Sequence, residues 1–167
     1  MDIDKRRIAV TAIIGCLLSL SGCVPMVSGD LEDIAHARYQ PCVRAATPYR
    51  IDVESNAEDA YASGPVSWLT DLSLGLIPTF QSEVIDSRAR LYRDGVLQHT
   101  YRFKSRVTVY YGWVWLLFLD TDSVNALPVD EGAGVRARTG IRDRTIAKAL
   151  SESDLDIAPN ALCYSDD

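Results

Sequence analysis

The chain has 167 residues and a formal net charge of −6, with 17 basic and 23 acidic side chains. This acidic balance argues against a nucleic-acid-binding protein, because such proteins concentrate positive charge on one face. Hydrophobic residues make up 47% of the chain, which argues against wholesale disorder and for a folded core.

The first 23 residues have the three parts of a secretory signal. Lys5, Arg6 and Arg7 form a positively charged start, and an uncharged apolar run at 8–20 follows them. The run has 13 residues, fewer than the roughly 20 that a helix needs to span a bilayer. The tetrapeptide Leu20-Ser21-Gly22-Cys23 comes at its end.

This segment resembles the signal of bacterial lipoproteins, whose lipobox ends in the cysteine that receives lipid. The resemblance implies cleavage before Cys23, a thioether diacylglycerol on its sulfur, and an acyl chain such as palmitate on its amino group. Two or three acyl chains anchor a protein stably, whereas a single chain binds marginally. In Gram-negative lipoproteins an aspartate after this cysteine usually causes retention in the inner membrane. Val24 follows here, so the resemblance favours the outer membrane. The alternative is an ordinary signal peptide with a coincidental cysteine.

Cleavage at this point predicts three regions. They are a signal peptide at 1–22, the lipidated cysteine with a short tether at 23–30, and one globular domain at 31–167. The removed segment carries three basic and two acidic residues, so the net charge of the mature chain would be −7.

The remaining cysteines form an even pair. Cys16 would leave with the signal and Cys23 would carry lipid, which leaves Cys42 and Cys163 in an oxidising compartment. We therefore expect a disulfide between them, and two independent thiols are the alternative. A metal site is less favoured, because the chain has two histidines and no close Cys/His spacing.

Four short elements are expected in the first half of the domain, and one of them is a short helix to Tyr61, because Ser55 and Glu58 have capping-box spacing. Asp30 is typical of an N-cap and predicts a helix to about Tyr39. Residues 49–54 alternate apolar and polar side chains, which predicts a strand. Residues 68–77 are ambiguous, although alternating leucines favour a strand. Within them, Leu74-Gly75-Leu76-Ile77-Pro78 resembles small uncharacterised envelope lipoproteins over a few residues, which implies no function.

The clearest structural signal is a long β-hairpin. Apolar and polar side chains alternate in 81–93 and in 96–109, and the Asp94-Gly95 pair between them is typical of a turn. A two-residue turn would place the two apolar faces on opposite sides. A three-residue loop that starts at Arg93 pairs Leu91 with Leu97 and places them on one side, so we choose that register.

The alternation disappears after Tyr110. The run 110–119 is almost wholly apolar, and it predicts either a central strand buried on both faces or an exposed patch for a membrane interface or a protein partner. Residues 139–150 predict a helix whose apolar stripe could cover the run. The tail around Cys163 is expected to be held only by the disulfide.

Together these elements predict an α+β fold. An antiparallel sheet is built around the hairpin of 81–93 and 96–109, and the C-terminal helix at 139–150 packs on it.

No catalytic motif stands out in the chain. His36 lies on a predicted helix, and His99 lies on the apolar face of the hairpin, where a buried histidine bonded to a backbone carbonyl is favoured over an acid–base role. The carboxylates are interpreted as a solvated surface. We therefore expect no enzymatic activity, no cofactor and no metal.

Two features carry a binding hypothesis. The first is the polar face of the hairpin, which could attract anionic head groups by about 1 kcal/mol per charge or could simply keep the sheet soluble. Its basic residues are Arg88, Arg90, Arg102, Lys104 and Arg106, with Arg102 expected opposite Asp86. The second is the aromatic run at 110–118, in which the candidate contacts are Tyr110, Tyr111, Trp113 and Trp115.

The expected function follows from the predicted location and from the lack of a catalytic motif. It is a lipid-anchored envelope lipoprotein that acts as a non-enzymatic accessory or interaction protein, with its domain in the periplasm or at the cell surface and an envelope protein as partner. The alternative is a lipid- or glycan-binding envelope module that uses the aromatic run and the basic hairpin face. An envelope hydrolase comes third.

Overall fold

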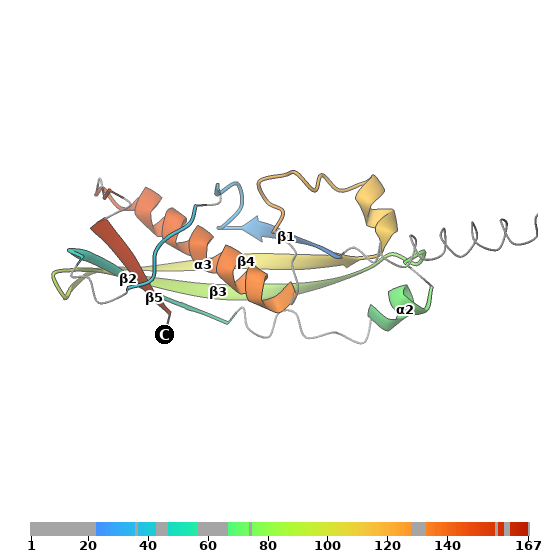
Figure 1. The fold of residues 1–167 in the computed structure, drawn as a ribbon, viewed down its shortest axis with the longest axis horizontal. Helices are drawn as coiled ribbons and strands as arrows, with labels where there is room; N and C mark the ends of the chain where they lie inside the picture. Colours follow the sequence, from blue (N-terminus) through green and yellow to red (C-terminus); the bar gives the residue numbers. More distant parts are fainter. Residues whose placement is uncertain are drawn as a thin grey trace, which may run out of the picture.

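Two long strands joined by a tight turn form the centre of the structure. In the computed structural model the described residues are 23–35, 37–42, 47–56, 67–73, 75–127, 133–155, 157–158 and 161–166. The expected signal peptide, His36 and most of the short helix expected to end at Tyr61 lie outside them. The described strands form one sheet in the order β1-β4-β3-β2-β5 (Figure 1). They are β1 (Cys23–Gly29), β2 (Tyr49–Ser55), β3 (Thr79–Arg93), β4 (Val96–Tyr111) and β5 (Leu162–Asp166).

The fold is α+β, as the sequence predicts. Every neighbouring pair of strands is antiparallel except β2 and β5, which are parallel. Helix α3 (Ala133–Glu152) extends beyond the predicted 139–150 at both ends and packs on β2 and β3 (Figure 1). The core lies between this helix and the sheet, and its largest fully buried apolar side chains are Leu31, Ile51, Ile85, Leu91, Ile141, Ile146 and Val107.

The hairpin turn is tighter than expected. Asp94 and Gly95 both have positive φ, at 49° and 78°. Two consecutive positive φ angles define a type I′ turn, which matches the twist of the flanking strands. Arg93 pairs directly with Val96, so the expected three-residue loop is wrong.

A β-bulge next to the turn restores a common apolar face. Tyr92 pairs with Leu97 and Leu91 pairs with His99, so Gln98 is one extra residue in β4. An extra residue reverses the alternation of the side chains that follow it. The apolar residues of both strands therefore point towards α3 although the turn has two residues. The expected pairing of Leu91 with Leu97 is wrong, and Leu97 is exposed.

The tether expected at 23–30 is largely a strand instead. β1 pairs with β4 from Cys23 onward, and Cys23 lies opposite Tyr111. Val24 and Val27 are buried, and Val27 belongs to the core cluster. Residues 23–29, which were expected to be a spacer, are therefore part of the sheet.

The helix expected from Asp30 to Tyr39 is also wrong. Residues 30–33 form a turn, and none of the described residues 30–35 is helical. The Asp30 carboxylate accepts a hydrogen bond from the Lys104 N–H at 2.7 Å, and the Leu31 N–H donates to the Ser105 hydroxyl at 3.1 Å. These bonds tie the segment to β4 and replace the hydrogen bonds of a helix.

Both edges of the sheet are partly covered by other parts of the chain. Beyond β1, a returning loop lies along the strand, and its Leu127 N–H donates to the Pro25 carbonyl. Beyond β5, the segment that precedes β2 in the chain lies along the edge, and its Cys42 N–H donates to the Tyr164 carbonyl. Because open strand edges invite pairing with other chains, these bonds make strand addition at these positions unfavourable.

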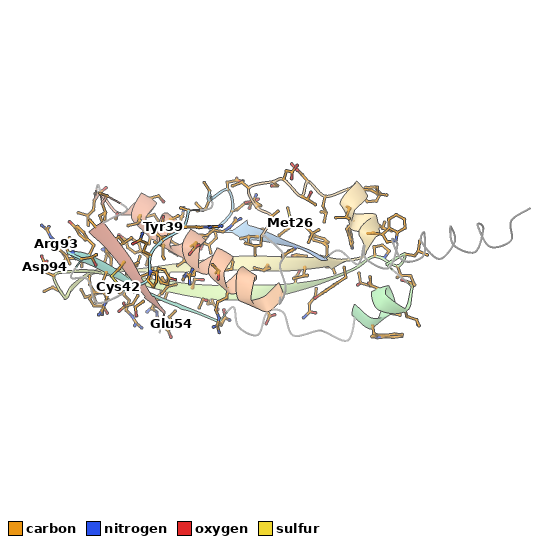
Figure 2. The ribbon with its side chains drawn as sticks, viewed as in Figure 1. Met26, Tyr39, Cys42, Glu54, Arg93 and Asp94 are labelled. Carbon is orange, nitrogen blue, oxygen red and sulfur yellow. A yellow bond between two sulfur atoms is a disulfide. The ribbon has the colours of Figure 1, made fainter. Side chains whose placement is uncertain are left out.

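The Cys42–Cys163 disulfide is present, as the sequence predicts (Figure 2). It links β5 to the segment that covers its edge. The tail is not held by the disulfide alone, because β5 also pairs with β2, with Tyr49 opposite Leu162.

Replacing both cysteines (Cys42→Ser with Cys163→Ser) should lower the melting temperature. The bridge spans a sequence separation of 121 residues. Constraining a loop of that length is worth about 2–5 kcal/mol, which corresponds to a fall of roughly 5–15 °C for a domain of this size. Thermal melts with and without reductant measure this effect, and the reduced wild-type protein should match the double variant. An equal melting temperature for the oxidised wild type and the variant would contradict a stabilising role.

Candidate functional site

The end of the hairpin opposite the turn carries a cluster of exposed apolar side chains. It is built by helix α2 (Ser67–Leu72), the connection from α2 to β3, and the short 3-10 helix η1 (Trp113–Leu117) after β4 (Figure 1). We call this cluster the apolar tip. Its members are between 40% and 76% exposed, and they are Trp68, Leu72, Leu76, Ile77, Phe80, Leu116, Leu117 and Phe118.

The aromatic run is not a buried central strand. Only Tyr110 and Tyr111 belong to β4, and η1 begins at Trp113. Leu117 and Phe118 are 70% and 75% exposed. Helix α3, which we expected as a cover, contacts β2 and β3 instead. The exposed part of the run is Leu116, Leu117 and Phe118, whereas the candidate contacts are half-buried, namely Tyr110, Tyr111, Trp113 and Trp115.

The α2 half of the tip was missed at the sequence level. Residues 68–77 were ambiguous in sequence, with a strand favoured, but the segment begins as helix α2, which ends at Leu72. Leu72 and Leu76 are compatible with strand alternation and also with a helical spacing of four residues, so periodicity could not decide. The usable signal was composition, because 67–82 contains one charged residue, Asp71.

Ring contacts support the base of the tip. The Trp115 indole N–H donates to the Thr79 carbonyl at 2.9 Å. Its ring centroid lies 4.9 Å from that of Tyr110 and 6.4 Å from that of Phe80, both in edge-on geometry. Because edge-to-face contacts of this kind stabilise aromatic clusters, η1 is fixed against the ends of β3 and β4.

Two glycines allow the two halves of the tip to touch. Gly75 and Gly112 have φ angles of 82° and 108°, which favour glycine. A Cβ atom on Gly112 would lie 2.8 Å from the Gly75 carbonyl oxygen, and one on Gly75 would lie 2.8 Å from Cδ1 of Trp113. The Thr70 and Thr79 hydroxyls also share a hydrogen bond of 2.5 Å. The tip is therefore a single packed unit.

Alanine at Gly112 should destabilise the protein more than alanine at Gly95. Both positions have positive φ, which costs an L-residue about 1–2 kcal/mol. Nothing lies within 4 Å of a Cβ on Gly95, whereas Gly112 also meets a backbone oxygen, at a further cost of about 1–3 kcal/mol. Urea unfolding of Gly112→Ala and the control Gly95→Ala measures the difference. Equal losses would show that the two halves of the tip are not closely packed.

The second candidate surface is the basic ribbon on the open face of the sheet, the face that points away from α3. Its members are Arg88, Arg90, Arg102, Lys104 and Arg106. The structure places all five on this face, but Arg102 lies opposite Arg88 and not opposite Asp86 as expected. The two-residue turn shifts the register of β4 by one residue from the expected one, and the bulge at Gln98 shifts it by one more.

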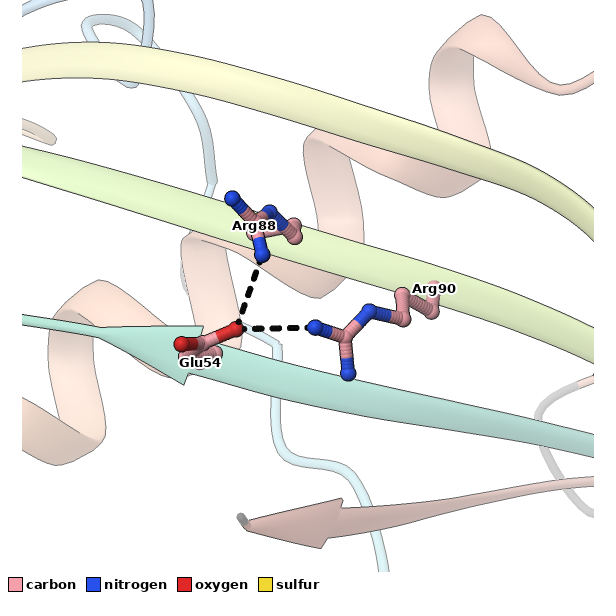
Figure 3. A network of polar contacts seen from close by, with 3 residues as sticks. All are labelled: Glu54, Arg88 and Arg90. Atoms are coloured by element: carbon pink, nitrogen blue, oxygen red, sulfur yellow. Dashed lines mark hydrogen bonds and ion pairs between the residues drawn. The ribbon is translucent and has the colours of Figure 1, made fainter.

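One carboxylate partly neutralises the basic ribbon. Glu54 Oε2 accepts hydrogen bonds from Arg88 at 3.3 Å and from Arg90 at 3.0 Å (Figure 3). Within the described part of the chain, no ion pair reaches Arg102, Lys104 or Arg106. An open hollow of about 430 Å³ has two acidic and two basic residues in its lining, namely Glu54, Asp86, Arg88 and Arg102. The ribbon therefore keeps positive charge that an anionic partner could meet.

The histidine expected in the core is exposed. His99 packs its ring against Tyr101 at 4.6 Å between centroids, at the bulged part of β4. His99 lies opposite the buried Leu91 but is itself exposed, so the expected buried histidine is wrong.

Buried charges belong to the scaffold. The Arg144 guanidinium donates to the carbonyls of Leu31, Val124 and Ala126, and burial lowers the pKa of Arg144. The pKa of Tyr39 is raised, first by burial and then by the negative charge of Asp143. Arg144 thus satisfies loop carbonyls that would otherwise be buried without partners.

Metal ligands do not gather in the described part of the chain, where no group of three or more His, Cys, Asp or Glu could hold an ion. No helix among the described residues is long and apolar enough to cross a membrane. No protein-family model, curated protein or solved structure matches this chain.

Proposed function

We propose that this protein is a lipid-anchored bacterial envelope lipoprotein that acts as a non-enzymatic accessory or interaction protein, located at the outer membrane. The lipobox-like tetrapeptide ending at Cys23 supports the anchor. The observation that carries the proposal is the place of that cysteine in the sheet. Residue 23 is the first residue of β1 and lies opposite Tyr111. Tyr111 is followed by Gly112 and then by η1, which belongs to the tip. An anchor here would hold the apolar tip at the membrane.

The basic ribbon is the surface best suited to a partner. The two sheet edges are partly occupied by the chain itself, and α3 covers one face of the sheet. The open face presents Arg102, Lys104 and Arg106 to solvent. We therefore propose an envelope protein with an acidic surface as the partner, because complementary charge steers association and fixes orientation.

An anionic glycan or lipid head group is the second candidate ligand of this face. The hollow lined by Arg88 and Arg102 favours it, since these two guanidinium groups lie on paired residues, although Glu54 and Asp86 also belong to the lining. Arginine binds carboxylate and phosphate groups through paired N–H donors.

Cys23→Ala should abolish labelling of the protein by radioactive palmitate in a bacterial host that makes the full chain. Unprocessed precursor should accumulate, because the acceptor of the lipid is gone. The matched control is Cys16→Ala, which removes a cysteine from the apolar run and should leave labelling and processing intact. A normally processed, unlabelled and soluble wild-type protein would contradict the anchor.

Crosslinking in the same cells tests the interaction role. A dominant acidic envelope protein should be captured by the wild type, and its yield should fall at least about tenfold in Arg102→Glu with Arg106→Glu. Capture that does not change with these charges would contradict the assignment of the basic ribbon. A bound glycan or lipid in place of a protein would favour the second candidate.

A further inference from the structure

We infer that the apolar tip inserts into the bilayer surface next to the anchor, so that the acyl chains and the tip hold the protein at one end and the hairpin projects away from the membrane. This inference rests on the proposed function, because the anchor at Cys23 is what brings the tip to the bilayer.

The anchor residue and both halves of the tip leave the same end of the sheet. Tyr111 lies opposite Cys23 on one side and opposite Thr79 on the other. η1 follows Tyr111 after one residue, and the connection from α2 enters β3 at Thr79. Acyl chains on residue 23 would therefore enter the bilayer within a few residues of the tip.

The chemistry of the tip fits the interfacial zone of a bilayer. Residues 110–119 and 72–82 contain no charged side chain. All three tryptophans of the chain, Trp68, Trp113 and Trp115, belong to the tip or its base. Tryptophan and tyrosine favour the membrane–water interface, where an apolar ring meets a polar head-group layer. The Trp115 N–H already has a partner in the protein, so immersion of that ring leaves no donor unsatisfied.

The exposed members gather at one end of the hairpin, on α2, η1 and the segments next to them (Figure 1). Leu72, Leu76, Leu117 and Phe118 are each more than 60% exposed. Single exposed apolar residues are normal on a protein surface, but a concentration of them at one place marks an interaction surface. The glycine contact between Gly75 and Gly112 holds the two halves together, so the patch is formed before it meets a membrane.

The position of the anchor residue and the three tryptophans favour a bilayer as the occupant of this patch. The charged residues that flank the patch in the sequence are acidic, at Asp71 and Asp120. Along β4 the nearest positive charge is Arg106, five residues before Tyr111 and so roughly 17 Å along the strand. The basic ribbon therefore lies beyond the depth at which the tip would meet lipid, and it stays available to another ligand.

Intrinsic tryptophan fluorescence tests this inference directly, because every tryptophan lies at the tip. The probe is the mature protein, extracted from host membranes and reconstituted into vesicles of phosphatidylglycerol and phosphatidylcholine with or without bromine on the acyl chains. We expect bromine to quench at least about half of the emission. Mass spectrometry of the same preparation reports whether residue 23 carries lipid, which tests the proposed function separately.

A matched pair of variants distinguishes insertion from mere proximity. Leu117→Asp with Phe118→Asp should remove most of the quenching, although the acyl chains still bring the protein to floating vesicles. Val96→Asp with Leu97→Asp changes two exposed apolar residues at the turn end and should leave the quenching unchanged. Because all four side chains are about half exposed or more, thermal melts should show folded protein in each case.

The outcomes separate the two proposals. Acylated protein that floats but shows no quenching overturns tip insertion and leaves the lipoprotein assignment intact. Protein that carries no lipid overturns the lipoprotein assignment. In that case, quenching of its tryptophan emission by the brominated vesicles would still support tip insertion, and no quenching would overturn it. Quenching that both variants reduce equally overturns a specific role of the tip. A crosslinked dimer that only the tip variant loses, without quenching, would assign the patch to a second copy and also overturn the inference.

Discussion

The pairing of β3 with β4 is the constraint on which the rest of the structure depends. The type I′ turn sets one register, and the extra residue Gln98 shifts it so that both apolar faces point to α3. β1 pairs with the outer edge of β4, β2 pairs with the outer edge of β3, and β5 then pairs with β2. The same alternation leaves the basic residues of both strands on the open face. One bulge therefore determines both the core and the charged surface.

The hairpin gives the molecule two chemically different ends. Arg93 and Asp94 lie at the turn, at the same end as Cys42 of the disulfide, and the opposite end carries α2 and η1 (Figure 2). A strand of 15 residues spans roughly 50 Å, so the turn and the tip are far apart. In the arrangement that we propose, lipid on Cys23 would bring the apolar end to the bilayer and the hairpin would extend into the aqueous space. The basic ribbon would then lie between the two ends, where the proposed envelope partner could reach it.

Local patterns in the sequence predicted the elements but not their register. Two-residue alternation predicted the hairpin and β2, and counting cysteines predicted the Cys42–Cys163 bridge. The bulge at Gln98 could not be predicted, because it is favoured only once α3 requires both apolar faces on one side. The structure of residues 68–77 was not predicted for a related reason, since it depends on tertiary contacts such as the close approach of Gly75 to Trp113. The alternation of side chains in the hairpin predicted the basic ribbon. Of the two halves of the tip, the sequence indicated only the η1 half.

The most direct test of this account is the height of the hairpin turn above the membrane. A donor dye attached through Val96→Cys, in protein anchored to vesicles that carry an acceptor dye in their head groups, reports that distance by energy transfer. An upright hairpin places the donor roughly 40–50 Å from the bilayer surface and predicts weak transfer. Strong transfer, as for a donor within about 20 Å, would mean that the sheet lies flat with its basic ribbon on the lipid, and it would contradict the account.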